Sequence, residues 1–94
     1  MRKFDLGKVV MTQGVMSLIE KEPLLDIEIA SSLYSHCIND WGELCEEDKQ
    51  ANDYAVENEE RILSAYTIGE NKVKIWIITE CDRSYTTILL PEEY

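Results

Sequence analysis

The chain has 94 residues, with 19 acidic and 9 basic side chains and a formal net charge of −10. This length fits one domain, and the 45% hydrophobic content predicts that it folds. The negative charge argues against direct binding to nucleic-acid phosphates or to anionic lipids, because both need clustered lysine and arginine.

The first segments in chain order are a basic arm and a helix. Residues 1–8 are slightly basic, and we expect a loose N-terminal arm there. The pattern turns helical at Thr12, a suitable N-cap residue, although Gly14 is unfavourable by about 1 kcal/mol in a helix interior. The helix is expected to end near Glu22, because Pro23 disfavours the α conformation in the residue before it.

Two further helices are predicted before residue 60. A helix from about Pro23 to Ile38 is indicated by apolar residues that repeat every four positions on one face. These residues are Leu25, Ile29, Leu33 and Cys37. A weaker helix from about Glu46 to Asn58 begins with three acidic residues, at the end where the helix dipole favours negative charge. Its apolar face is thin, so it needs a sheet or another helix to hold it.

After Asn58 the pattern becomes that of strands. β-Branched, aromatic and other apolar residues fill Arg61–Ile68, Val73–Thr79 and Tyr85–Leu90, and short connections of the kind that join antiparallel neighbours separate them. We therefore predict a single α+β domain over residues 1–94. In it, two to three N-terminal helices pack on a C-terminal three-stranded antiparallel β-meander.

The sequence also bears on the compartment. No segment reaches the roughly 20 apolar residues of a membrane span, and no signal-type apolar run follows the basic N-terminus. The three cysteines, an odd number without paired spacing, argue against a disulfide framework. We therefore expect a cytoplasmic protein with reduced thiols.

Negative charge is concentrated between Asp40 and Glu60. The segment holds nine acidic residues against one base, Lys49, so it carries eight of the ten net negative charges. The nine are Asp40, Glu43, Glu46, Glu47, Asp48, Asp53, Glu57, Glu59 and Glu60. On a continuous helix, positions 46, 53, 57 and 60 share one side. Such a face is either only a solvated side of the helix, or it binds a basic partner in a salt-dependent manner, for example by imitating nucleic-acid phosphate.

Trp41 lies in the loop before the acidic helix. It either pins this loop onto the core or, if exposed, serves as an interface anchor. The candidate partner-binding surface therefore includes the tryptophan with seven acidic residues. Its members are Asp40, Trp41, Glu43, Glu46, Glu47, Asp53, Glu57 and Glu60.

A second candidate site is the connection between the last two strands. Glu80, Asp82 and Arg83 lie beside Cys81, and the arginine fork suits a carboxylate or a phosphate. The alternative is a charged hairpin loop in which Arg83 pairs with an acid or with turn carbonyls. A nucleophilic role for Cys81 would need a nearby base, and nothing places the only histidine, His36, beside it.

Metal and cofactor sites are not predicted. The spacing of His36 and the cysteines differs from that of structural zinc sites, and the four glycines are too scattered for a phosphate-binding loop. We expect His36 at the helix surface or half-buried, and we expect no cofactor and no catalytic residue.

Several strings resemble a family of short bacterial proteins that are labelled plasmid-related and occur on plasmids and other mobile elements. The likeness covers about residues 11–94, and six strings carry it. They are Asp40-Trp41-Gly42-Glu43-Leu44, Glu46-Glu47-Asp48-Lys49, Arg61-Ile62-Leu63-Ser64-Ala65-Tyr66, Ile75-Trp76-Ile77-Ile78-Thr79-Glu80, Asp82-Arg83-Ser84 and Leu89-Leu90-Pro91-Glu92-Glu93-Tyr94. The resemblance implies a mobile-element setting and no activity. Cys81 stands where the family usually has a small residue, which further weakens a catalytic role for it.

Three function classes follow from these features. The first is a non-enzymatic interaction module whose acidic surface engages a basic protein, such as a nucleic-acid-binding or defence protein. The second is a small-molecule or nucleotide-binding domain that uses Glu80, Asp82 and Arg83. The third is a protein that self-associates through an exposed sheet edge. We favour the first, without membrane or direct nucleic-acid binding, and the sequence leaves the oligomeric state open.

Overall fold

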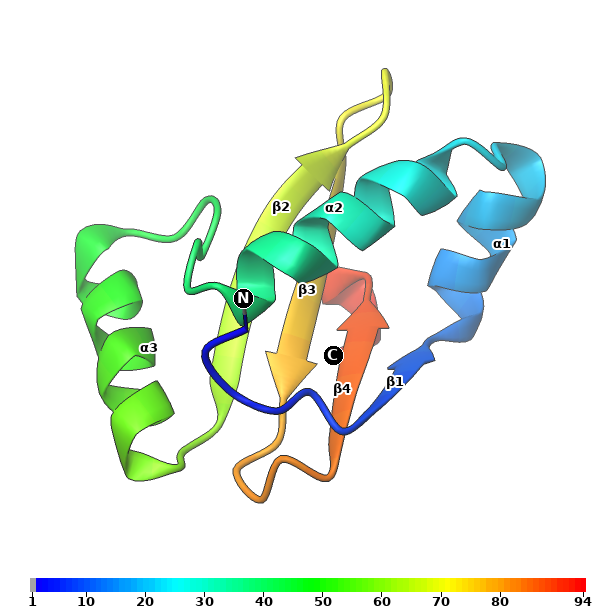
Figure 1. The fold of residues 1–94 in the computed structure, drawn as a ribbon. Helices are drawn as coiled ribbons and strands as arrows, with labels where there is room; N and C mark the ends of the chain where they lie inside the picture. The colour runs from blue at the N-terminus through cyan, green and yellow to red at the C-terminus, as the bar shows by residue number, and fades with distance from the viewer. Residues whose placement is uncertain (1) are drawn as a thin grey trace.

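The structure is a computed structural model that describes residues 2–94, and in this range three α-helices accompany a four-stranded mixed sheet. Figure 1 shows α2 lying across one face of the sheet, with α1 beyond the β1 side and α3 beyond the β2 side. The elements in chain order are β1 (Lys8–Met11), α1 (Gln13–Lys21), α2 (Leu25–Cys37), α3 (Glu46–Asn58), β2 (Ile62–Ile68), β3 (Val73–Thr79), β4 (Tyr85–Leu89) and the 3₁₀ turn η1 (Pro91–Glu93).

The α+β class is confirmed, and the sheet is larger than predicted. Strands β2, β3 and β4 form the expected antiparallel meander, and β1 adds a fourth strand parallel to β4. Residues 2–8 do not form the loose arm that the sequence predicted. Phe4 is buried, and Lys8 already belongs to β1; Met1 lies outside the described residues.

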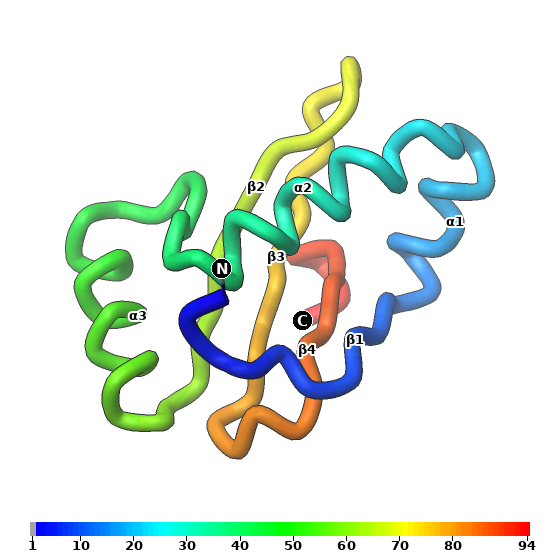
Figure 2. Tube along the Cα trace, viewed as in Figure 1, coloured from blue at the N-terminus to red at the C-terminus, as the bar shows by residue number. Residues whose placement is uncertain are grey.

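The N-terminal segment crosses the end of the sheet before it enters β1. Figure 2 shows it running from the end of α2 past β3 and β4. The backbone N–H of Lys3 donates to the carbonyl of Cys37, and the backbone N–H of Lys8 donates to the carbonyl of Ser84. The segment is therefore fixed at both ends by backbone hydrogen bonds.

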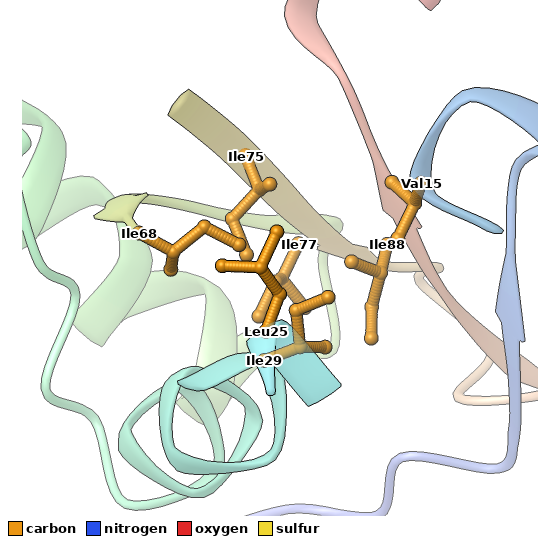
Figure 3. Packing of buried hydrophobic residues seen from close by; sticks show 7 residues of the cluster. All are labelled: Val15, Leu25, Ile29, Ile68, Ile75, Ile77 and Ile88. Atoms are coloured by element: carbon orange, nitrogen blue, oxygen red, sulfur yellow. The ribbon is translucent and has the colours of Figure 1, made fainter. Parts of the chain in front are cut away.

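The core lies between α2 and the sheet and continues under α1. Its cluster, drawn in Figure 3, joins one residue of α1, two of α2 and four of the sheet. These are Val15, Leu25, Ile29, Ile68, Ile75, Ile77 and Ile88. A second, smaller cluster holds α3 and the N-terminal segment against β2. It consists of Phe4, Trp41, Ala55 and Ile62. The site that α3 carries therefore rests on a small core of its own.

Candidate functional site

The acidic residues of segment 40–60 are all exposed, and most of them belong to α3 or to the loop before it. We call the nine of them the acidic face. Helix α3 turns Asn52 and Ala55 inward, which leaves Glu46, Asp53 and Glu57 on its outer side. Their shared orientation follows from the helical period and from the small residues on the inner side.

Glu60 departs from the predicted pattern. The helix ends at Asn58, and Glu59 takes the left-handed conformation with φ of 53°. The chain therefore turns before Glu60, so this residue does not continue the helical row of positions 46, 53 and 57. It is exposed and contributes charge beside the end of the helix.

The acidic face is scarcely neutralised within the molecule. Among residues 2–94, the only one of its carboxylates in an ion pair is that of Glu43, which lies 3.7 Å from the Lys74 ammonium. The same carboxylate accepts a hydrogen bond from the Thr67 hydroxyl at 2.8 Å. The charges thus face water at close spacing, which creates a negative potential at this end of the molecule.

Trp41 is not part of an exposed surface. Only 3% of it is accessible, and its indole N–H donates to the carboxylate of Asp53 at 3.0 Å. This corrects its inclusion in the partner-binding surface, because a buried ring cannot anchor a partner. The other reading, that Trp41 pins the loop onto the core, is confirmed.

The loop before α3 is bound to the edge of β2. The N–H of Glu43 donates to the carbonyl of Ala65 at 2.8 Å, and the N–H of Ala65 donates to the backbone carbonyl of Trp41. Gly42 makes this approach possible, since its φ is +73° and a Cβ there would lie 2.1 Å from the Ala65 carbonyl oxygen. The loop thereby also covers part of an edge strand.

The inner side of α3 leaves a hollow against β2. Its volume is about 240 Å³, and it is lined by Leu44, Asp48, Ala51, Asn52 and Leu63. The Asn52 amide closes the floor, because its N–H₂ donates to the Leu63 carbonyl at 2.6 Å and its oxygen accepts from the Leu63 N–H at 3.4 Å. The hollow is therefore mostly apolar, with one carboxylate in its wall.

Glu80, Asp82 and Arg83 do not form a common site. Glu80 pairs with Arg61 at 3.5 Å, while Asp82 accepts hydrogen bonds from the backbone and hydroxyl of Ser84. These bonds from Ser84 lower the pKa of Asp82. A shallow hollow beside the C-terminal turn is lined by Glu80, but not by Asp82 or Arg83. Because the three side chains engage separate partners, the geometry gives no support to the ligand-binding alternative.

Arg83 instead joins three parts of the fold. Its guanidinium donates to the carbonyls of Ala55 at 2.9 Å and Glu60 at 2.6 Å, at the C-terminal end of α3. It also donates to the turn carbonyl of Glu80 and lies 5.6 Å from the centre of the Phe4 ring. A cation is favourable at a helix C-terminus, so Arg83 anchors the acidic helix to the hairpin.

His36 lies at the centre of a buried hydrogen-bond chain. The Thr86 hydroxyl donates to the Leu6 carbonyl at 2.7 Å, so it must accept from Thr79 at 2.8 Å. The Thr79 oxygen then accepts the Nε2 proton of His36 at 2.8 Å, and Nδ1 accepts from the Ser64 hydroxyl at 2.6 Å. The chain thus has one direction and fixes a proton on Nε2, so that Nδ1 is the acceptor when the imidazole is neutral.

The expectation of an exposed or half-buried His36 is wrong. The residue is 0% accessible and packs edge-on against Phe4 and Trp41. Burial, and secondarily the charge of Arg83, lowers the pKa of His36 to about 3. The sequence did hold a signal for this burial. The spacing of Leu25, Ile29, Ser32 and His36, which is close to the 3.6-residue helical period, matches the buried face better than a strict four-residue repeat.

Within residues 2–94, no three His, Cys, Asp or Glu side chains are arranged to hold a metal ion. In the same range, no helix has the length and apolar character needed to cross a membrane. Comparison with protein-family models, with curated proteins and with solved structures gives no match to this chain.

Proposed function

We propose that the protein is a non-enzymatic interaction module that binds a basic protein through the acidic face on and before α3. The observation that carries the proposal is the concentration of exposed carboxylates, of which only Glu43 has an ion-pair partner among residues 2–94. A basic surface that approaches this end exchanges repulsion among the acids for attraction across the interface. Such attraction accelerates association and weakens with salt.

The partner chemistry follows from the same charges. Nucleic-acid-binding proteins present clustered lysine and arginine, and a row of carboxylates on a helix can occupy that surface in place of phosphate. The resemblance to plasmid-related proteins fits a target of this kind, such as a host nucleic-acid-binding or defence protein. The bound partner would then be displaced by high salt, and the acidic face would compete with DNA for the basic surface of that partner.

The test compares two sets of charge variants. Glu46, Glu57 and Glu60 are exposed members of the acidic face, and each is replaced by glutamine. The matched control replaces Glu20, Glu70 and Glu92, which are exposed elsewhere, so both triple variants lose the same total charge. Immobilised wild-type protein and both variants are exposed to a bacterial lysate at about 0.05 M and about 0.5 M salt, and the bound proteins are identified by mass spectrometry.

We expect the wild type and the control to retain basic nucleic-acid-binding proteins at low salt only. We expect the variant of the acidic face to lose them. A purified captured protein should then bind the wild type with a Kd that rises steeply with salt and should be released by added DNA. Recovery of no such protein at low salt, or equal recovery by both variants, would contradict the proposal.

A further inference from the structure

The hollow between α3 and β2 gives the acidic face an apolar component. Leu44 and Leu63 are half-buried in its walls, and Ala51 is exposed at its rim. The polar groups of its floor are already paired with each other, because Asn52 is bonded to the backbone of Leu63 through both amide atoms. An entering apolar side chain would therefore bury hydrocarbon without leaving a donor or acceptor of the floor unpaired.

The hollow exists because the inner side of α3 is made of small residues. Ala51 and Asn52 line the hollow, so at this point the helix meets the strand through the Asn52 amide and leaves space beside it. An apolar space of this kind, at the rim of a charged surface, is typical of a pocket that receives an anchor side chain.

The hollow opens on the face of the sheet that α2 does not cover. Ser64 points toward His36 of α2, so its neighbour Leu63 points to the opposite face. There Leu63 pairs across the strands with the buried Ile78.

The charges around the hollow define what it accepts. Asp48 forms part of its wall, and Glu47 and Glu43 are exposed close by in the chain. No ion pair involves Glu47 or Asp48 within residues 2–94. An acidic segment would be repelled here, and a purely apolar one would leave these charges without a partner. Charge complementarity therefore selects a segment that carries lysine or arginine beside its apolar residue.

We propose that a basic partner docks by inserting one aliphatic or aromatic side chain into the hollow lined by Leu44, Ala51 and Leu63, while neighbouring lysine or arginine side chains pair with Glu47 and Asp48. This inference rests on the proposed function and adds the recognition of an apolar anchor to the attraction of charge. It distinguishes a specific partner from any cation, because charge alone would bind all basic segments alike.

The test uses two fluorescent peptides and two variants. In one peptide a leucine lies between two pairs of lysines, and in the other a serine replaces the leucine. Ala51→Phe fills the hollow without a change of charge. Ala30→Phe is the matched control, an exposed alanine on the outer side of α2. Circular dichroism verifies that both variants are folded, and Kd is measured by fluorescence anisotropy at low salt.

We expect wild-type protein and Ala30→Phe to bind the leucine peptide about tenfold more tightly than the serine peptide. Burial of one leucine side chain supplies the free energy for a difference in Kd of about this size. Ala51→Phe should bind the two peptides equally. In wild-type protein, the leucine peptide should shift the amide resonances of Leu44, Ala51 and Leu63, and the serine peptide should not.

The failures are distinguishable. If wild-type protein binds the two peptides equally, or if Ala51→Phe keeps the preference for leucine, the inserted anchor is refuted and the electrostatic function stands. If neither peptide binds at low salt, the proposed function itself fails, and the inference fails with it.

Discussion

His36 couples protonation to folding, because its two ring nitrogens are buried and both are bonded to hydroxyl groups. Protonation would create a buried charge, and this charge would lie close to Arg83; the Ser64 hydroxyl would also have to turn from donor to acceptor at Nδ1. The imidazole therefore stays neutral in the folded state well below the pH at which an exposed histidine titrates.

The pH dependence of stability follows with a definite sign. The pKa of His36 is about 3 in the folded state and about 6.5 in the unfolded state, so the unfolded chain binds more protons between these values. We expect the free energy of unfolding to decrease as pH falls below about 6.5, by about 1.4 kcal/mol per pH unit from this residue. Urea unfolding at several pH values measures the decrease.

The same experiment has a direct spectroscopic control, because the chain contains one histidine. The ring proton resonance of the folded protein should show no titration between pH 8 and about 5, whereas the urea-unfolded chain should titrate near pH 6.5. A folded-state titration near pH 6.5 would contradict the buried neutral assignment.

At the level of elements, the helices and the meander were predictable and the fourth strand was not. The predicted third helix has the observed bounds Glu46–Asn58, and the second differs from α2 by two residues at its start and one at its end. These elements carry local signals, namely apolar periodicity, the first-turn acids of α3 and β-branched runs. Strand β1 has four residues, and its partner β4 lies at the other end of the chain, so no local pattern reveals the pairing.

The hydrogen-bond partners of individual side chains could not be predicted from the sequence for the same reason. The spacing placed Glu80, Asp82 and Arg83 together, but Arg83 turns toward the end of α3, which is near it only in the fold. The acidic face was predictable because its members are close in sequence. The hollow beside it was not, since Leu63 and Ala51 meet only after β2 packs against α3.

Glu93 connects the C-terminal turn to the start of α1. Its carboxylate accepts hydrogen bonds from the Thr12 hydroxyl and from the backbone N–H groups of Gly14 and Leu90. The bond from Thr12, and then that from Leu90, lowers its pKa. A Cβ on Gly14 would lie 2.6 Å from this carboxylate, so the Glu93 side chain would have to shift to admit one.

We expect Glu93→Gln to lower the thermal stability and to speed hydrogen exchange in the first turn of α1, because the amide is a weaker acceptor than the carboxylate. The stabilisation should be present above the ordinary glutamate pKa and be lost as pH falls through the lowered value. Glu92→Gln is the matched control, since Glu92 is exposed in the same turn. Equal melting temperatures for the two variants would refute the connection.

At the scale of the whole molecule, the acidic face and the main hydrophobic core lie in different parts of the fold. The main core lies between α2 and the sheet, whereas α3 is held by its smaller cluster and by Arg83. In Figure 1, α3 occupies one end of the molecule. The element with the densest charge thus depends on the smaller of the two buried clusters.

This separation leads to a prediction about the end of α3. Glu57 lies in its last turn and Glu60 just beyond, where the helix dipole disfavours negative charge, and no basic residue of the helix lies in that turn. Arg83 of the hairpin caps this end, but among residues 2–94 it forms no ion pair with either acid. If these acids serve a partner and not the fold, Glu57→Gln with Glu60→Gln should raise the free energy of unfolding by about 0.5–1 kcal/mol at low salt. The gain should shrink as added salt screens the repulsion in the wild type, since exposed charges are screened over about 10 Å at 0.1 M salt. Urea titrations of wild type and double variant at low and high salt measure it. A double variant clearly less stable than wild type at low salt would show that the carboxylates hold α3 in place, which would remove the reason to regard their exposure as a binding feature.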